Sequence, residues 1–167
     1  MFTAVDSTYF AKHEGIDGMI SFAAGGAFVY PTMVSAGVEN DIKLFTTGFD
    51  GGEENNFGSN GTKTYQQLTA TAPETIVFPL VLLLNKINGV DFVDQPEVAE
   101  RLSGELYLIN SDEDVAKVQT SLYFTKDPAN AVYTAEDILA MTAFANPEAT
   151  YANLVEKTTQ LTVESIK

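Results

Sequence analysis

The residue with the clearest potential for chemistry is Asp50, which ends the segment 42–50 (IKLFTTGFD). This segment is predicted to be a β-strand because its apolar residues form a short run bounded by glycine. A carboxylate at the carboxyl end of a parallel strand lies where open α/β sheets bind their ligands. It can accept two hydrogen bonds from neighbouring hydroxyls of a sugar. The sequence leaves open a second interpretation, in which Asp50 only caps the polar loop that follows.

Other kinds of reactive site find little support in the sequence. The chain has no cysteine and a single histidine, His13, which excludes thiolate chemistry and any site with two imidazoles. The acidic run from Asp112 to Asp114 lacks the alternating ligands and central glycine of a calcium loop and is typical of a helix start. The paired glycines lack the trailing glycine or lysine of nucleotide-binding motifs. We therefore predict no catalytic residue, no metal site and no cofactor.

The composition is that of a folded, acidic chain. Of 167 residues, 45% are hydrophobic, and 23 acidic residues against nine basic ones give a net charge of −14. A field of that sign repels phosphate backbones, so nucleic acid is not expected as a partner. Residues 1–20 show no signal-peptide pattern, and the longest apolar run, 76–84, is too short to cross a bilayer.

The elements that must position Asp50 alternate between strands and helices. Strands are predicted at 17–23, 42–50 and 65–71, and helices at 27–37 and 74–87. This alternation predicts an α/β fold with a parallel sheet flanked by helices. The helix 74–87 reads as apolar nearly all round, which predicts that it is buried against other parts of the protein.

Residues 91–167 differ from the first part of the chain in their predicted secondary structure, which has one strand at 105–110 and several short helices. Capping residues at 111–114 and 134–137 predict two helix starts, and 148–155 is expected to form another short helix. We expect two regions, an α/β region at 1–90 and a mostly helical C-terminal extension at 91–167 that packs on the same domain.

The order of these segments resembles the C-terminal part of type I periplasmic-type solute-binding proteins and their LacI-type regulator relatives. The motifs that carry the resemblance are His13–Gly18 (HEGIDG) before the first strand, Gly48–Gly51 (GFDG) at the end of the second, and Pro73 before the long apolar helix. The resemblance covers about half of the chain, roughly residues 10–90. It implies that 1–90 is the C-terminal part of a two-lobed protein, in which the helix 74–87 would pack in the other lobe, and that this chain is a piece of a longer one.

The same resemblance implies a ligand site. Asp50 would bind ligand hydroxyls, and Thr71, two residues before the proline, would offer a further hydroxyl. Gly25 stands where many members of the family carry Asn or Asp, which leaves the choice of sugar open and could let a larger ligand approach the backbone. Aromatic residues expected near the same edge could stack on a sugar or a base, or belong to the core; they are Phe22, Phe28, Tyr30 and Phe49.

The function implied is that of the extracytoplasmic solute-binding component of an ABC-type uptake system, which closes two lobes around a small polar, sugar-like ligand. Its partner would be the membrane permease of the transporter. With the other lobe missing, the chain is expected to self-associate through the apolar helix 74–87. Two alternatives stay open: the effector-binding domain of a LacI-type transcriptional regulator, and a small stand-alone enzyme using Asp50 or Glu53.

Overall fold

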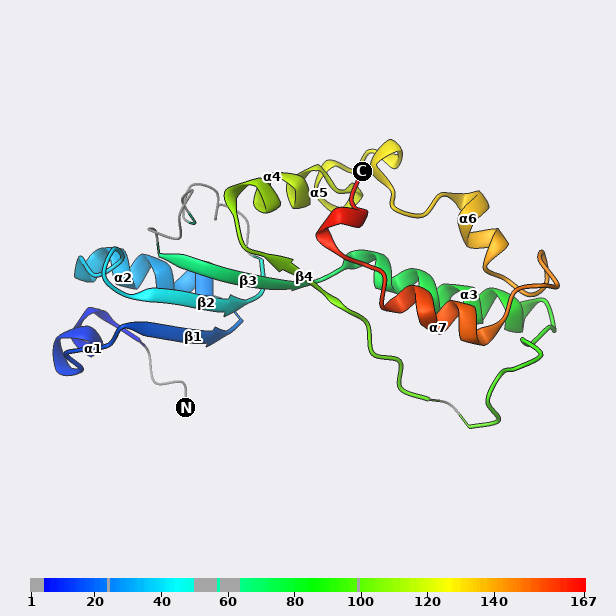
Figure 1. The fold of residues 1–167 in the computed structure, drawn as a ribbon, viewed down its shortest axis with the longest axis horizontal. Coiled ribbons are helices and arrows are strands. Elements are labelled where there is room, and N and C mark those ends of the chain that lie inside the picture. Colours follow the sequence, from blue (N-terminus) through cyan, green and yellow to red (C-terminus); the bar gives the residue numbers. More distant parts are fainter. Residues whose placement is uncertain (1–4, 24, 50–56, 58–63, 99) are drawn as a thin grey trace. The chain divides into compact units, whose positions relative to one another are not determined.

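The computed structural model describes residues 5–23, 25–49, 57, 64–98 and 100–167, and it confirms the α/β fold class. The structure contains one four-stranded sheet with helices beside it (Figure 1). The strands lie in the order in which they occur in the chain, namely β1 (Gly18–Phe22), β2 (Lys43–Thr47), β3 (Tyr65–Thr71) and β4 (Leu106–Ile109).

The first three strands are parallel, as the sequence predicts. Ile20 of β1 lies opposite Phe45 of β2, and Phe45 lies opposite Gln67 of β3. The pairing of β2 with β3 shifts by one residue between Leu44 and Phe45. The carboxyl ends of β1, β2 and β3 therefore meet at one edge of the sheet.

The helices beside these strands are α1 (Ser7–Lys12), α2 (Tyr30–Ala36) and α4 (Asp112–Thr120), and α2 is shorter than the helix predicted at 27–37. A π-helical turn, Gly25–Val29, precedes α2 and was not expected from the sequence. Pro31 lies in the first turn of α2, where its missing N–H costs no hydrogen bond. Gly37 ends the helix with a φ of 71°, a left-handed conformation that favours glycine.

The two faces of the sheet differ in what covers them. Leu44 and Leu68 are completely buried, as are Met33 of α2 and Val115 of α4 in the core of the same unit. The opposite face carries Ile20 and Phe45, which are 71% and 42% exposed. Parallel sheets normally have both faces covered, whereas Ile20, Phe22 and Phe45 on this face are exposed.

A second group of elements follows β3. A 3₁₀ turn at Pro73–Ile76 leads directly into α3 (Val77–Ile87), which Gly89 follows with a φ of 67°. The remaining helices are α5 (Leu122–Thr125), α6 (Ala135–Ala140) and α7 (Tyr151–Thr158), with 3₁₀ turns at Pro128–Asn130 and Val163–Ser165. The regular elements of region 91–167 are thus helices and 3₁₀ turns, with β4 as the one strand among its described residues.

Helix α3 is buried along one side only, which corrects the expectation of burial all round. Val77, Phe78 and Val81 face the interior, while Leu83 and Ile87 are 55% and 71% exposed. The exposed apolar side chains recur at helical spacing and are Ile76, Leu80, Leu83 and Ile87. We call this set the α3 stripe.

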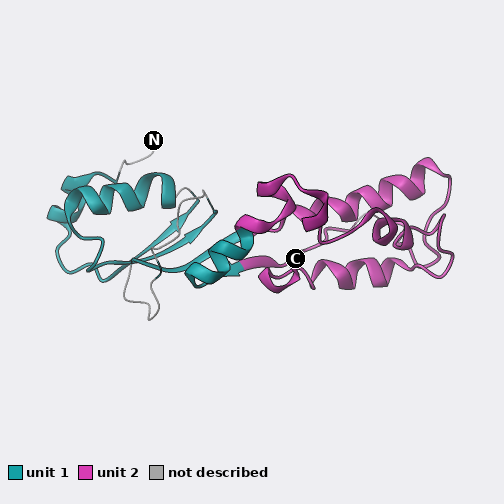
Figure 2. Ribbon diagram, turned by 90° about the horizontal axis from the view of Figure 1, so that it is seen from above, with its two compact units in different colours: residues 1–70, 108–118 teal, residues 71–107, 119–167 magenta. Residues whose placement is uncertain are grey.

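The chain folds into two compact units, shown in different colours in Figure 2. The first unit comprises residues 1–70 and 108–118, and the second comprises 71–107 and 119–167. This division does not follow the expected boundary at residue 90, because the chain leaves the first unit at the last residue of β3 and returns to it within β4. The assignment of 1–90 and 91–167 as separate regions stays a prediction.

The length and apolarity of the described helices can be compared with what a membrane-spanning helix requires. Even α3, which is rich in leucine and valine, has only 11 residues. Within the described ranges, every helix falls short of the length and apolarity that crossing a bilayer requires.

Candidate functional site

The candidate site lies at the carboxyl edge of the first unit's sheet, where β1, β2 and β3 end side by side. Phe22, the last residue of β1, lies opposite Thr47 of β2, and Thr47 lies opposite Thr69 of β3. Because partners in a parallel register point to the same face, one aromatic ring and two hydroxyl-bearing side chains form a row. We call Phe22, Thr47 and Thr69 the edge row.

Phe22 is the most accessible member of the edge row. Its side chain is 85% exposed although it is a large apolar residue in a strand. An exposed aromatic ring beside polar groups is a suitable surface for stacking on a sugar or a base. The structure thus places Phe22 at the predicted edge, and its contact with a ligand stays a prediction.

The two threonines of the edge row differ in their hydrogen bonding. Oγ1 of Thr47 accepts a hydrogen bond of 2.7 Å from the backbone N–H of Ala23. Oγ1 of Thr69 is buried and has no hydrogen-bond partner in the described part of the chain. A buried hydroxyl without a partner is costly and marks a place where a polar partner would be stabilising.

The turn after β1 also brings Gly25 close to β2. A Cβ atom at Gly25 would overlap the side chain of Thr46, so only glycine fits at this buried position. This close approach gives a structural reason for the glycine where the resembling family often has Asn or Asp. Gly25 brings backbone rather than a side chain to the edge, and its role in binding stays a prediction.

The GFD motif begins directly after the edge row. Gly48 has a φ of 108°, which disfavours any residue with a side chain, and its N–H donates to the carbonyl of Thr69. The pairing of β2 with β3 therefore extends one residue beyond Thr47. Phe49 is half-buried. Asp50, the residue on which the sequence prediction depends most, lies outside the described residues.

The other residues named from the sequence are placed less favourably. Thr71 is exposed and is the last residue of β3, but it belongs to the second unit. Phe28 lies exposed in the π-helical turn. Tyr30 packs on Tyr65 with ring centroids 5.3 Å apart, so it belongs to the packing of α2 on the sheet.

Sequence reasoning missed Thr47 and Thr69. Both lie in predicted strands, and only the register of the sheet shows that they share a face with Phe22. The period-2 alternation of strand residues could have placed each on the open face. The alignment of the two strands could not be read from the sequence, because it includes the shift at Leu44.

The described residues give no support for metal chemistry. No group of three or more His, Asp or Glu side chains among them could hold a metal ion. The one histidine, His13, packs against the ring of Tyr9 at the end of α1, with centroids 4.5 Å apart. The candidate site therefore consists of hydroxyls, backbone amides and one exposed aromatic ring.

Comparisons with known proteins do not add a family to this description. A scan of family models, a search of curated proteins and a search of solved structures each found no match to this chain.

Proposed function

We propose that this chain is part of the extracytoplasmic solute-binding component of an ABC-type uptake system, and that it binds a small polar, sugar-like ligand at the edge row. The observation that carries the proposal is the register, which aligns Phe22, Thr47 and Thr69 at the carboxyl ends of three parallel strands. Open α/β sheets bind ligands at this edge. The edge row offers the exposed ring of Phe22 as an apolar stacking surface beside the half-buried Thr47, a combination that suits a sugar.

The path of the chain supports the same proposal. β3 starts in the first unit, and its last residue, Thr71, already belongs to the second. A binding protein that closes around its ligand needs strands that connect its two lobes and absorb the motion. In the proposed function the second unit contributes to the other lobe, and the membrane permease of the transporter is the partner of the closed form.

A titration observed by NMR tests the proposal directly. The ¹⁵N-labelled chain is titrated with pentoses, hexoses and nucleosides, and the resonances of Phe22, Thr47 and Thr69 are expected to shift together. Weak binding is expected, because one part of a two-lobed protein supplies only some of the contacts. Shifts confined to the amino ends of the strands would contradict the proposal.

Matched variants separate the edge from the rest of the sheet. Asp50→Asn is expected to weaken binding, whereas Asp41→Asn, which changes the same kind of residue before the other end of β2, leaves it unchanged. Phe22→Ala is expected to weaken binding more than Phe45→Ala, since Phe45 lies on the same face but away from the edge. Equal losses within either pair would contradict binding at the carboxyl edge.

A further inference from the structure

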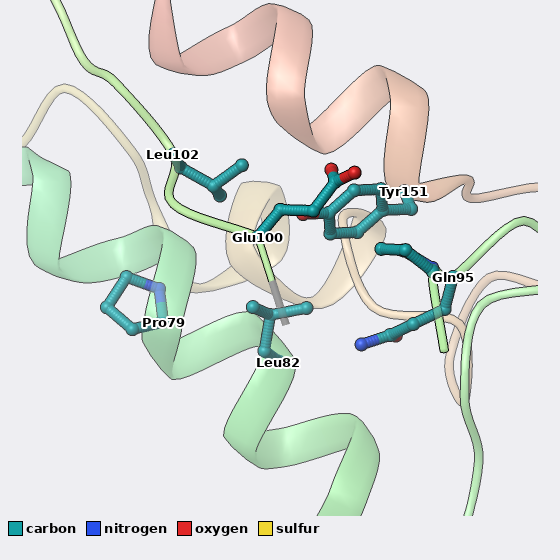
Figure 3. A pocket seen from close by; sticks show the side chains of 7 residues that line it. Pro79, Leu82, Gln95, Glu100, Leu102 and Tyr151 are labelled. Atoms are coloured by element: carbon teal, nitrogen blue, oxygen red, sulfur yellow. The ribbon is translucent and has the colours of Figure 1, made fainter. Parts of the chain in front are cut away.

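The second unit contains a cavity that plays no part in the proposed function. Its volume is about 310 Å³, near the lower end of the range for small-molecule pockets. Three parts of the unit form its walls: helix α3, the segment between α3 and β4, and the first residue of α7. The side chains labelled in Figure 3 are Pro79, Leu82, Gln95, Glu100, Leu102 and Tyr151.

The cavity is held open by bonds between segments that are distant in the sequence. The carboxylate of Asp94 accepts hydrogen bonds from the N–H groups of Tyr151 (2.7 Å) and Ala152 (2.9 Å) at the start of α7. The ring of Phe92 is buried beside that of Tyr151, with centroids 6.4 Å apart. These contacts attach the residues before Gln95 to the start of α7, where Tyr151 lines the cavity.

The lining separates into an apolar wall and an acidic end. Pro79, Leu82 and Leu102 supply aliphatic surface, while Glu100 brings a carboxylate to the same cavity as the ring of Tyr151 (Figure 3). Burial, and then the charge of the nearby Glu100 carboxylate, raise the pKa of the Tyr151 phenol. Among the lining residues that the structure describes there is no lysine or arginine.

We propose that this cavity binds small organic cations with an apolar body, such as arylalkyl ammonium ions. The ammonium group would pair with the Glu100 carboxylate and lie against the face of Tyr151, where a cation–π interaction adds to the ion pair. The Gln95 amide oxygen can accept one of its N–H bonds. The apolar body would fill the space between Leu82 and Leu102. An anion of the same shape would meet the charge repulsion of the Glu100 carboxylate in place of an ion pair.

Three ligands of one shape test this proposal. The ¹⁵N-labelled chain is titrated with 2-phenylethylammonium, with the neutral 2-phenylethanol and with the anionic phenylacetate. The ammonium ion is expected to bind at least about fivefold more tightly than the alcohol, with shifts at Leu82, Gln95 and Leu102. The anion is expected not to bind. Equal affinity for the ammonium ion and the alcohol would overturn the assignment.

A matched pair of variants separates the cavity from the general acidity of the chain. Glu100→Gln keeps the size of the side chain and is expected to remove the preference for the cation. Glu97→Gln removes an equal charge from the same segment, but Glu97 does not line this cavity, so the preference is expected to stay. If both variants lower the affinity equally, the chain attracts cations through its net charge and the proposed site is wrong.

Discussion

The backbone N–H of Ala23 donates a 2.7 Å hydrogen bond to Oγ1 of Thr47, which ties the turn after β1 to the end of β2. The hydroxyl of Ser21 donates to the carbonyl of Ala23 at 2.9 Å and holds the same turn from within β1. Ala23 has a φ of 72°, in the left-handed region that residues with a Cβ atom disfavour. Two side-chain hydroxyls thus hold this turn, at the candidate site, in a strained conformation.

Replacing Ala23 with glycine is expected to stabilise the protein. Glycine relieves the left-handed strain but loses more conformational entropy on folding, so the net gain in free energy of unfolding should be about 0.5–1 kcal/mol. Urea denaturation followed by circular dichroism measures it. Ala116→Gly, on the exposed side of α4, is the control and should destabilise. A loss of stability in Ala23→Gly would show that the turn is not left-handed.

The hydroxyl of Thr47 is expected to contribute to stability through its bond to Ala23. Thr47→Val keeps the shape but removes the acceptor, which should cost about 1 kcal/mol in the free energy of unfolding. Thr47→Ser keeps the acceptor and should cost less. Denaturant unfolding measures the free energy of unfolding of both variants. Equal losses in the two variants would contradict the expectation that the hydroxyl contributes more to stability than the methyl group.

Several elements could be predicted from the sequence because their signals are local. The bounds of β3 match the prediction at 65–71. The helix start at Thr134 is confirmed, since Thr134 and Asp137 form a reciprocal capping box. In each case the deciding residues lie within one turn or one strand of each other.

Other elements depend on partners far away in the sequence and could not be predicted. Helix α7 begins at Tyr151, three residues later than predicted, where Asp94 binds its first N–H groups across 57 residues of chain. The left-handed turn at Ala23 is stabilised by Thr47, 24 residues away. Such bonds leave no periodic signal, and the edge row went unrecognised for the same reason.

Acid is expected to weaken the attachment of Asp94 to α7. The hydrogen bonds from Ala152 and Tyr151 lower the pKa of Asp94. A carboxyl whose pKa is lowered by folding stabilises the protein above its unfolded pKa of about 3.9, and this stabilisation disappears as the pH falls through the folded value. Asp94→Asn should therefore be less stable at neutral pH and lose less on acidification.

Unfolding midpoints between neutral pH and about pH 3 measure this difference. Glu97→Gln, in the same segment but without such bonds to α7, is the matched control and should follow the wild type. Parallel pH profiles for Asp94→Asn and the wild type would rule out the proposed role of Asp94.

The buried pair of Tyr107 and Glu74 is expected to make the second unit sensitive to alkali. The Tyr107 hydroxyl donates a 2.8 Å hydrogen bond to Glu74, and burial followed by this bond raises the pKa of Tyr107. Folding therefore favours the neutral phenol, and its stabilising effect is full below about pH 10 and lost as the pH rises further.

Tyr107→Phe should cost about 1–3 kcal/mol at neutral pH, because the buried Glu74 carboxylate loses its donor. It should also flatten the alkaline part of the stability profile, measured by fluorescence-detected unfolding. Tyr123→Phe, at an exposed tyrosine of the same unit, should change neither quantity. If both variants have the same free energy of unfolding and the same alkaline profile, the hydrogen bond to Glu74 does not contribute to stability.

The α3 stripe gives a structural basis for the predicted self-association, which stays a proposal. Large exposed apolar side chains repeated along a helix are typical of contact surfaces. Sedimentation analysis over a range of concentrations is expected to show association of the wild type. Leu83→Glu should abolish it, whereas Val93→Glu, at a fully accessible valine of a connecting segment, should not. A wild type that stays monomeric throughout would contradict the proposal.

The interleaving of the two units affects the order in which they can form during synthesis. The first unit requires nothing beyond residue 118, whereas the second must wait for 119–167. Since chains fold from the amino end as they emerge from the ribosome, the first unit can close around β4 while residues 71–107, already made, still lack their partners. No single cleavage of the chain separates the two units, because residues 71–107 of the second unit lie between the two parts of the first. Engineered versions must therefore keep both units on one polypeptide or supply them as split, complementing pieces.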